Sequence, residues 1–490
     1  MTKLLRSLLQ SKHRCHSSTS PLFTLINPAN ATPHSHYHAP TPDDLSHALE
    51  LSSASQKQWS KSSPTQRSTI LRRAADILSQ NVQHVSRLET MDTGRPIRET
   101  EFDVLEGIEC LHYYSGQILQ SHDLLYNHPT GQAYVKRVPM GTTCGIGAWN
   151  YPFQGVLWKG VASVVYGNSM MYKPSEFTPS TALWMEECLV EAGLPEGVFQ
   201  VVLGGGETAQ HLIHSPKISK VSFTGSVSTG LRVYQQAAAS MKKVTMELGG
   251  KSPLIIFNDA HLDNAVCGAM MANWYSSGQV CSNGTRVFVQ EDVMDEFVQR
   301  LLERTKKLRI GDPMDTETDI GPMVHKLQYD KVLDYIHIGM KEDRATLLYG
   351  GKRPNNLPSH IQNGYNLQPA IFTNCTDEMT IAKEEIFGMV MSILSFKSEQ
   401  EVIERANNTE FGLAAGVFTQ DIQRGQRVID SLDAGAAWIN NYNLAPIYLP
   451  WGGCKLSGIG RENGVASVEE WTQWKSVYCE MGDVDCPYPK

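Results

Sequence analysis

The sequence of 490 residues lacks the features that mark membrane and repeat proteins. It contains no apolar run of about 18 residues, so we expect no membrane-spanning helix. No repeat of about 20–50 residues is present, which argues against a solenoid. With 41% apolar and 19% charged residues, the composition is typical of a globular protein with a large core. The length predicts two or three domains, since a domain usually has about 100–150 residues.

The ten cysteines form none of the arrangements that bind a metal or build a disulfide framework. There is no Cys-x-x-Cys pair and no Cys/His cluster with zinc spacing, so we predict no metal site. Scattered cysteines fit free thiols in a reducing compartment. One of these thiols is therefore available as a nucleophile.

The first 42 residues contain no acid and four basic residues: Lys3, Arg6, Lys12 and Arg14. This pattern is typical of a mitochondrial targeting peptide, which we place at residues 1–22 with the matrix as destination. A cytoplasmic protein with a disordered basic tail is the alternative. The formal net charge is −8, so the rest of the chain carries −12. That charge argues against nucleic acid as a partner.

Short apolar segments alternate with helical stretches and Gly/Pro turns along the chain. Such alternation predicts parallel strands buried between layers of helices, hence an α/β fold. Residues 66–91 are predicted to form one amphipathic helix, and residues 465–484 are a β-like tail suited to pairing between subunits. We expect two α/β lobes that meet near residue 248. The expected strands are residues 135–138, 141–146, 169–172, 198–203, 220–223, 243–246, 253–257, 285–289, 389–395 and 416–419.

Two segments of the first half are candidates for binding a nucleotide. Residues 223–230 (FTGSVSTG) follow an apolar strand and lead into a helix, whose free N–H groups could hold a pyrophosphate. The pattern differs from the usual dinucleotide fingerprint, so a plain strand-to-helix turn is the alternative. Residues 173–176 (KPSE) follow another strand. The Glu176 carboxylate could accept hydrogen bonds from ribose hydroxyls and repel a 2′-phosphate, unless this is a solvated turn.

Two residues near the middle of the chain are candidates for chemistry. Glu247 ends a predicted strand before two glycines, where a mobile carboxylate can act as a base towards water. Cys281 follows 34 residues later, among small and polar residues that could present its sulfur to a cleft. Taken singly, such a cysteine is usually a small buried residue and such a glutamate usually lies on the surface.

These segments together resemble the NAD(P)-dependent aldehyde dehydrogenase superfamily, over roughly residues 26–478. The resemblance includes the motifs GAWNYP (147–152), KPSE (173–176), FTGS (223–226), ELGGK (247–251), GQVC (278–281), EEIFG (384–388) and GIGRE (458–462). The segments NGTRVFV (283–289) and EMGDV (480–484) are most similar to the branch of 4-trimethylaminobutyraldehyde and betaine aldehyde dehydrogenases, family 9. Two positions depart from the family pattern: Met389 replaces the usual proline and Cys454 the usual tyrosine.

The resemblance implies the aldehyde dehydrogenase fold, with two Rossmann-like parallel-sheet lobes and a β extension for oligomerisation. It assigns residues 23–121 and 138–247 to an NAD-binding domain and residues 248–448 to a catalytic domain. Residues 122–137 and 449–490 would then bridge subunits. A homo-oligomer, either dimer or tetramer, is expected.

The resemblance also implies a mechanism for oxidising an aldehyde to a carboxylic acid. Cys281 attacks the aldehyde carbon, and the Asn150 amide with the Cys281 backbone N–H holds the oxyanion. Hydride leaves to NAD, and Glu247 then activates the water that hydrolyses the thioester. Lys159 and Glu462 form a buried relay that carries the proton out.

The same resemblance implies how the cofactor is held. Lys173 and Glu176 bind the adenosine ribose, and the 225–230 turn binds the pyrophosphate. Glu385 binds the nicotinamide ribose, and Phe387 packs against its ring. Glu176 favours NAD over NADP without forbidding the latter. The complete set of implied cofactor contacts is Ala148, Trp149, Lys173, Ser175, Glu176, Gly225, Ser226, Thr229, Gly230, Leu248, Glu385 and Phe387.

Four aromatic residues stand where betaine aldehyde dehydrogenases line their substrate tunnel: Tyr151, Trp158, Tyr275 and Trp451. Such rings attract a trimethylammonium group by about 0.5–2 kcal/mol each, without the desolvation cost of an ion pair. We therefore expect betaine aldehyde or 4-trimethylaminobutyraldehyde as substrate. Ordinary core packing of these rings, with aminoaldehydes or aliphatic aldehydes as substrates, is the alternative. An inactive structural protein of the same fold is the rival from another class.

Overall fold

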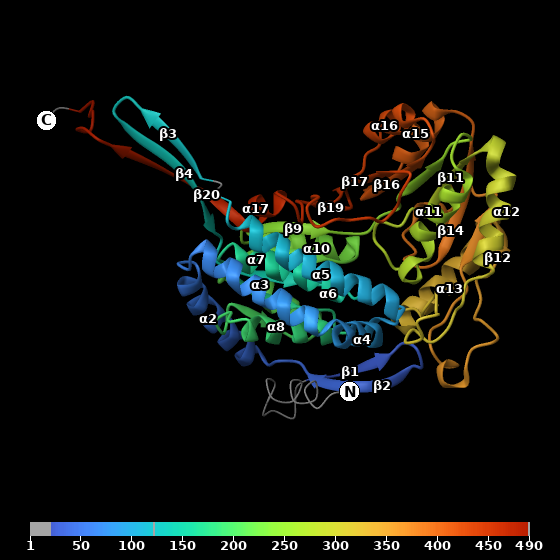
Figure 1. The fold of residues 1–490 in the computed structure, drawn as a ribbon, viewed down its shortest axis with the longest axis horizontal. Coiled ribbons are helices and arrows are strands. Elements are labelled where there is room, and N and C mark those ends of the chain that lie inside the picture. Colours follow the sequence, from blue (N-terminus) through green and yellow to red (C-terminus); the bar gives the residue numbers. More distant parts are fainter. Residues whose placement is uncertain (1–20, 121–122, 489–490) are drawn as a thin grey trace.

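The computed structural model describes residues 21–120 and 123–488, which form two α/β lobes and a projecting β arm (Figure 1). Most of the predicted targeting peptide lies outside these residues, so the mitochondrial destination stays a prediction. The described chain begins with a hairpin of β1 (Leu22–Asn27) and β2 (Thr32–His38). Among the described residues, no helix combines the length and apolar character needed to cross a bilayer.

The first lobe contains a six-stranded sheet with the order β19-β9-β8-β5-β6-β7. All neighbours are parallel except β19, which pairs antiparallel with β9 so that Gly458 faces Glu247. A segment near the end of the chain therefore returns to the strand end that carries Glu247. The strands are β5 (Thr142–Ile146), β6 (Ser169–Lys173), β7 (Phe199–Val201), β8 (Ile218–Thr224), β9 (Lys243–Glu247) and β19 (Gly458–Ile459).

Helices cover both faces of this sheet, because its strands are apolar on both sides. Met170 and Tyr172 point into one core, and Met171 between them points into the other. The first core packs against α3 (Pro64–Gln80), α4 (Val82–Thr93), α5 (Ile97–Gln117), α6 (Pro152–Val156), α7 (Ala162–Val165) and α8 (Ser180–Glu191). The second packs against α2 (Pro42–Trp59), α9 (Gly206–His214) and α10 (Val227–Ala238).

The single helix predicted over residues 66–91 is wrong. The chain forms α3 and α4 instead, with a break at Asn81. The Asn81 side chain donates to the Ile77 carbonyl at 2.8 Å and thereby closes the last turn of α3. Because both helices are amphipathic, their apolar pattern runs on across the break and conceals it.

The second lobe contains a seven-stranded sheet with the order β12-β13-β14-β11-β10-β16-β17, parallel except at β12. Its strands come from residues 253–439, so residue 248 separates the two sheets in the chain. The strands are β10 (Pro253–Ile256), β11 (Arg286–Gln290), β12 (Thr346–Tyr349), β13 (Ala370–Thr373), β14 (Val390–Phe396), β16 (Ala414–Phe418) and β17 (Ala436–Ile439). The helices are α11 (Leu262–Trp274), α12 (Met294–Thr305), α13 (Lys326–Lys341), α14 (Thr380–Lys383), α15 (Glu399–Asn407) and α16 (Ile422–Asp430).

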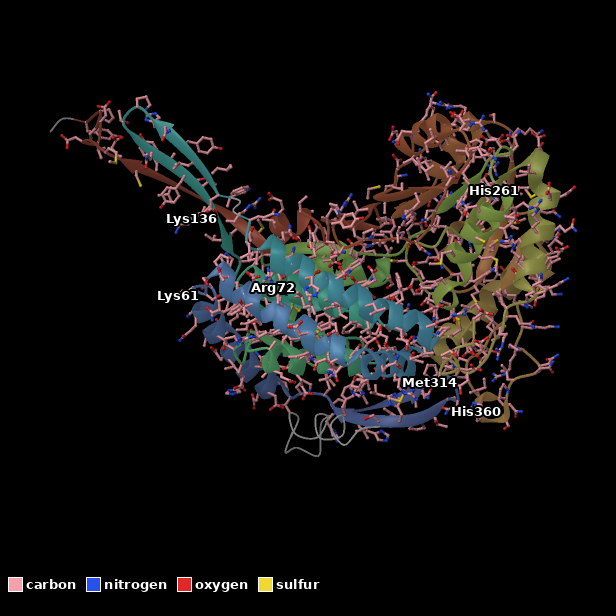
Figure 2. All side chains as sticks on the ribbon, viewed as in Figure 1. Lys61, Arg72, Lys136, His261, Met314 and His360 are labelled. Carbon is pink, nitrogen blue, oxygen red and sulfur yellow. The ribbon has the colours of Figure 1, made fainter. Side chains whose placement is uncertain are left out.

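The arm is an antiparallel sheet of β20 (Thr472–Glu480), β4 (Gly131–Pro139) and β3 (Leu124–His128). The β-like tail thus pairs with β4 of its own chain, and its side chains stand clear of the body (Figure 2). Leu125, Trp474 and Tyr478 are exposed on it. The subunit-bridging role of the arm and the exact domain bounds stay predictions. The short helix α17 (Ala466–Trp471) leads into β20, and β15 (Phe411–Gly412) pairs with β18 (Cys454–Lys455).

Candidate active site

Most of the predicted catalytic residues line one cavity of about 150 Å³, to which both lobes contribute. Cys281, Asn150 and Glu247 line it, and so does Glu462. The predicted aromatic residues Tyr151, Trp158, Tyr275 and Trp451 also line it, with α5 contributing Phe102, Asp103 and Glu106. Residues that lie far apart in the chain therefore share one space with the thiol.

Strained backbone positions the thiol. Between α11 and Cys281, three consecutive residues adopt left-handed conformations: Ser276 (φ 54°), Ser277 (φ 53°) and Gly278 (φ 73°). A Cβ on Gly278 would lie 2.3 Å from the Gly388 carbonyl carbon, so only glycine fits there. Such strain costs about 1–3 kcal/mol per non-glycine residue and persists where surrounding structure imposes it. Sequence reasoning missed the two serines, because nothing in their identity signals this conformation.

The Asn150 side chain is buried and held in one orientation. Its Nδ2 donates to the Gln279 carbonyl at 2.9 Å, two residues before Cys281. An amide nitrogen carries two hydrogens, so one N–H is left to point into the cavity beside the thiol. Asn150 is therefore placed to donate a hydrogen bond to an oxygen bound near the Cys281 sulfur.

Glu247 ends β9 with neither carboxylate oxygen hydrogen-bonded to a described residue. Burial, together with the nearby Glu462 carboxylate, raises its pKa well above the usual range. Burial also raises the pKa of the Cys281 thiol to about 12, and the Glu247 and Glu385 carboxylates add to this effect. A thiol and an unpartnered carboxylate that face one cavity can supply a nucleophile and a general base for water.

Lys159 and Glu462 form a buried ion pair behind the cavity. Lys159 lies in a π-helical turn, Leu157–Val161, directly after α6, and this turn directs its ammonium inwards. Glu462 also accepts a hydrogen bond from Ser222 Oγ at 3.1 Å. Backbone hydrogen bonds in both directions join Glu462 to Trp451. They keep this carboxylate beside the aromatic wall, as we call the four lining residues Tyr151, Trp158, Tyr275 and Trp451.

A second cavity of about 410 Å³ lies at the carboxyl end of the first sheet and shares Ala148 and Thr224 with the first. Its lining includes most of the predicted cofactor contacts: Trp149, Lys173, Ser175, Glu176, Gly225, Ser226 and Thr229. Ser226 is the N-cap of α10, and its hydroxyl accepts from the Thr229 N–H at 3.4 Å. Lys173 Nζ donates to the Pro174 and Gly204 carbonyls and lies 3.8 Å from the Glu176 carboxylate. A helix N-terminus in an open cavity suits an anionic ligand.

Gly230 and Leu248 do not line this cavity, and their roles as cofactor contacts stay predictions. A Cβ on Gly230 would lie 2.4 Å from Leu248 Cδ2, so the glycine permits close packing of α10 against the end of β9. Glu385 and Phe387 lie outside the lining as well. Glu385 Oε1 accepts from the Gly250 N–H at 3.2 Å, and the Phe387 ring meets the Trp149 ring edge-to-face at 5.2 Å.

Sequence reasoning missed the residues that support Trp149 and Phe387. His325 packs between Trp149 and Phe177, with ring centroids 5.3 and 4.3 Å away. Gln328 donates to the carbonyl of Phe387, which is held at φ 62°. His325 is the N-cap of α13 and Gln328 lies in its first turn. Both are distant in sequence from the family motifs.

Sequence reasoning also missed the cation beneath the aromatic wall. The buried Arg95 guanidinium lies 4.0 Å from the Tyr151 ring centroid and 5.9 Å from that of Tyr275. Arg95 is paired with Asp103 and lies 3.5 Å from Glu99. The carboxylates therefore balance its charge, and the two rings that it contacts also line the cavity.

The two departures from the family pattern lie outside both cavities. Met389 is fully buried in the second-lobe core. Cys454 is half-buried, and its thiol donates to the Gly412 carbonyl at 3.3 Å.

A thiol, an amide donor and a carboxylate facing one cavity, beside a second cavity with a helix N-terminus, define an enzyme that combines covalent thiol chemistry with an anionic cofactor. Residues 15–477 match the aldehyde dehydrogenase family. The chain belongs to that family, and it is an oxidoreductase that acts on aldehydes.

The similar proteins support this membership over nearly the whole chain. Betaine aldehyde dehydrogenase from Rhizobium etli (strain CIAT 652) is 52% identical over 467 residues, covering 94% of this chain and 95% of that protein. Betaine aldehyde dehydrogenase 1 from Rhizobium meliloti (strain 1021) is 50% identical over 465 residues, covering 94% and 95%. The crystal structure of betaine aldehyde dehydrogenase from Staphylococcus aureus in complex with NAD+ superposes with a TM-score of 0.93 at 31% identity, covering 100% of both chains. The predicted family and fold are thereby confirmed.

Proposed function

We propose that this enzyme oxidises betaine aldehyde, or a close trimethylammonio-aldehyde, to its carboxylate with NAD. The lining of the Cys281 cavity carries this proposal. It contains aromatic rings and no lysine or arginine among the described residues. Of its four acidic residues, Asp103 and Glu462 are paired with the buried cations Arg95 and Lys159, and burial raises the pKa of Glu247, so the rings and Glu106 carry the attraction for a cation. A cavity of this character favours a cationic head group over an anionic or neutral one.

The arrangement supports the following reaction. The Cys281 thiol releases its proton to water, and the sulfur bonds to the aldehyde carbon. The resulting oxyanion accepts hydrogen bonds from Asn150 Nδ2 and the Cys281 N–H, which stabilises the tetrahedral adduct. When bound, NAD accepts the hydride that leaves this carbon. Glu247 then takes a proton from the water that attacks the thioester, and the C–S bond breaks to release the acid.

The second cavity offers a helix N-terminus for the NAD pyrophosphate and the Glu176 carboxylate for a ribose. We assign the pyrophosphate to the α10 N-terminus with Ser226 and Thr229, and the adenosine ribose to Lys173 and Glu176. Glu176 is about one-third exposed. Its carboxylate can therefore accept hydrogen bonds from ribose hydroxyls, and it would repel a 2′-phosphate. Glu385 and Phe387, which border Gly249, Gly250 and Trp149, would contact the nicotinamide end.

Replacing Asn150 with alanine is expected to lower kcat about 10²–10³-fold, since one oxyanion donor is worth roughly 3 kcal/mol. The KM for NAD should stay unchanged, because Asn150 lies outside the second cavity's lining. Steady-state NADH formation measures both parameters. An Asn150→Ala variant with normal kcat would show that the oxyanion is held elsewhere.

The substrate assignment predicts a preference that depends on charge alone. Betaine aldehyde should exceed 3,3-dimethylbutanal, its neutral isostere, by at least about tenfold in kcat/KM. Trp158→Leu should raise the KM for betaine aldehyde about 2–30-fold and leave that for 3,3-dimethylbutanal nearly unchanged.

The control is Tyr448→Leu, which removes an exposed aromatic residue outside the cavity lining. It should alter neither KM. A wild-type preference for the neutral aldehyde would refute the cation-binding role of the wall. A preference for aldehydes with a primary ammonium group would instead identify an aminoaldehyde as the substrate.

A further inference from the structure

A ladder of buried polar side chains leads away from the active site along one face of β8 and β9. Ser222 and Thr224 alternate with apolar residues on β8, and Thr245 and Glu247 do so on β9. The parallel register sets Ser222 beside Thr245 and Thr224 beside Glu247. Register partners project on the same face of a sheet, at adjacent-strand spacing of about 4.8 Å. The ladder therefore continues inwards to the catalytic carboxylate.

The inner part of the ladder meets the relay pair already described. Glu462 accepts hydrogen bonds from Lys159 Nζ and from Ser222 Oγ, the latter at 3.1 Å. Glu462 and Glu247 line the same cavity, and the Glu462 carboxylate raises the pKa of Glu247. A proton on Glu462 thus has an ammonium and a hydroxyl within hydrogen-bond distance.

The outer part joins the ladder to the surface helix α17. Lys220, two residues before Ser222 on the same face, is fully buried and donates to Thr245 Oγ1 and to Glu470 Oε2, the latter at 2.9 Å. Thr245 Oγ1 also donates to Glu470 Oε2, at 2.9 Å. The Glu470 side chain is 14% exposed, so this triad touches solvent at one point.

The groups around Lys220 suit proton exchange. Burial lowers the pKa of Lys220 to about 8, against the opposing effect of Glu470. Lys243 lowers it further and Glu462 raises it. Burial raises the pKa of Glu470, but Lys220, Lys243 and the Thr245 hydroxyl together outweigh burial, so the pKa is lowered. The only ring against the ammonium in this part of the described structure is that of Trp471, at 4.9 Å.

We propose that Lys220, Thr245 and Glu470 form the outer half of a proton path that connects Glu247, through Glu462 and Ser222, to solvent at α17. The path rests on the proposed function, since it serves thioester hydrolysis. Water loses one proton to Glu247 as its oxygen bonds to the acyl carbon and the C–S bond breaks. That proton passes to Glu462, then by the Ser222 and Thr245 hydroxyls to the Lys220–Glu470 pair, and leaves from Glu470 to water.

Glu470 also has a structural contact that the test must separate from proton transfer. Its Oε1 accepts from the backbone N–H of Arg461, at 3.4 Å, next to Glu462. Loss of this contact could displace Glu462 without involving a proton. Glutamine at position 470 keeps the size of the side chain and one acceptor oxygen, which can serve either that N–H or Lys220, but it cannot carry a proton at neutral pH. Rescue by a diffusible base therefore separates proton transfer from a displaced Glu462.

The experiment measures decay of the acyl-enzyme by rapid quench in Glu470→Gln, with betaine aldehyde and NAD in weakly buffered solution. Decay should slow about tenfold, while formation of NADH in the first turnover stays at the wild-type rate. Adding imidazole should restore decay in proportion to its concentration, because a diffusible base replaces the lost exit. The wild-type pH profile of decay should lose its dependence on a group near pH 8 in this variant. Thr245→Val should slow decay in the same way.

The matched control is Glu469→Gln, the same change at a half-exposed neighbour on α17 that pairs with Arg137. It should leave decay unchanged. Wild-type decay in Glu470→Gln, or slowed decay that imidazole does not restore, would overturn the path. Absence of NADH formation by the wild-type enzyme would instead refute the proposed function, so the two failures are distinguishable.

Discussion

Cys281→Ala is expected to lower kcat/KM for betaine aldehyde by at least about 10⁴-fold, the scale seen when a covalent nucleophile is removed. Among the described residues, the cavity lining contains no other thiol, and the strained turn at residues 276–278 lies just before Cys281 in the chain. Steady-state NADH formation at saturating NAD measures the loss. Binding of NAD, followed by protein fluorescence quenching, should be retained, because Cys281 lies outside the second cavity's lining.

The matched control for this loss is Cys454→Ala. Cys454 is also half-buried, but it lies at β18 and lines neither cavity. Its replacement should leave kcat/KM within about twofold of wild type, as expected for a site away from the chemistry. Turnover that survives in Cys281→Ala would show that the nucleophile is misassigned.

Glu247→Gln is expected to separate the two halves of the reaction. Thioester hydrolysis should slow by about 10²–10⁴-fold, since a positioned general base contributes on that scale. The first turnover should still release about one NADH per active site, followed by a slow steady state, because hydride transfer precedes the hydrolytic step. Stopped-flow absorbance shows both phases in one trace.

Loss of the first-turnover NADH would contradict this division and would mean that Glu247 is needed to ionise Cys281 before attack. Measuring the first turnover at high pH tests this second possibility. Burial raises the pKa of the Cys281 thiol to about 12, so the thiolate becomes more abundant as the pH rises. A first-turnover rate that recovers at high pH would locate the defect at the thiol. The matched control is Glu410→Gln, an exposed carboxylate far from the cavity lining.

The fold class was predictable because short apolar strands and amphipathic helices alternate, and the family motifs occur in order. Those motifs lie where strands end: Glu247 ends β9, and residues 147–152 follow β5. Carboxyl ends of parallel strands meet at one edge of a sheet, so such residues converge. This geometry explains why Asn150 and Glu247, which the family motifs predict to be catalytic, line one cavity, while Cys281 reaches the same cavity from the loop before β11.

What the sequence could not show are contacts without a local pattern. Arg95 lies beneath Tyr151, and Lys220 meets Glu470, a residue 250 positions later in the chain. A lysine on a buried strand interrupts the apolar pattern, and the sequence does not show the distant partner that makes its burial possible. Gly230 shows a further limit, because in a sequence a glycine that permits close helix packing looks the same as one that admits a ligand.

The most direct test of the proposed chemistry is the site of covalent attachment. Glu247→Gln is mixed with betaine aldehyde and NAD, quenched in acid within the first turnover, and digested for peptide mass mapping. We expect one trimethylammonioacetyl group per chain, attached to Cys281 and dependent on NAD. NADH release without an acyl group on Cys281, or an acyl group on another residue, would contradict the account.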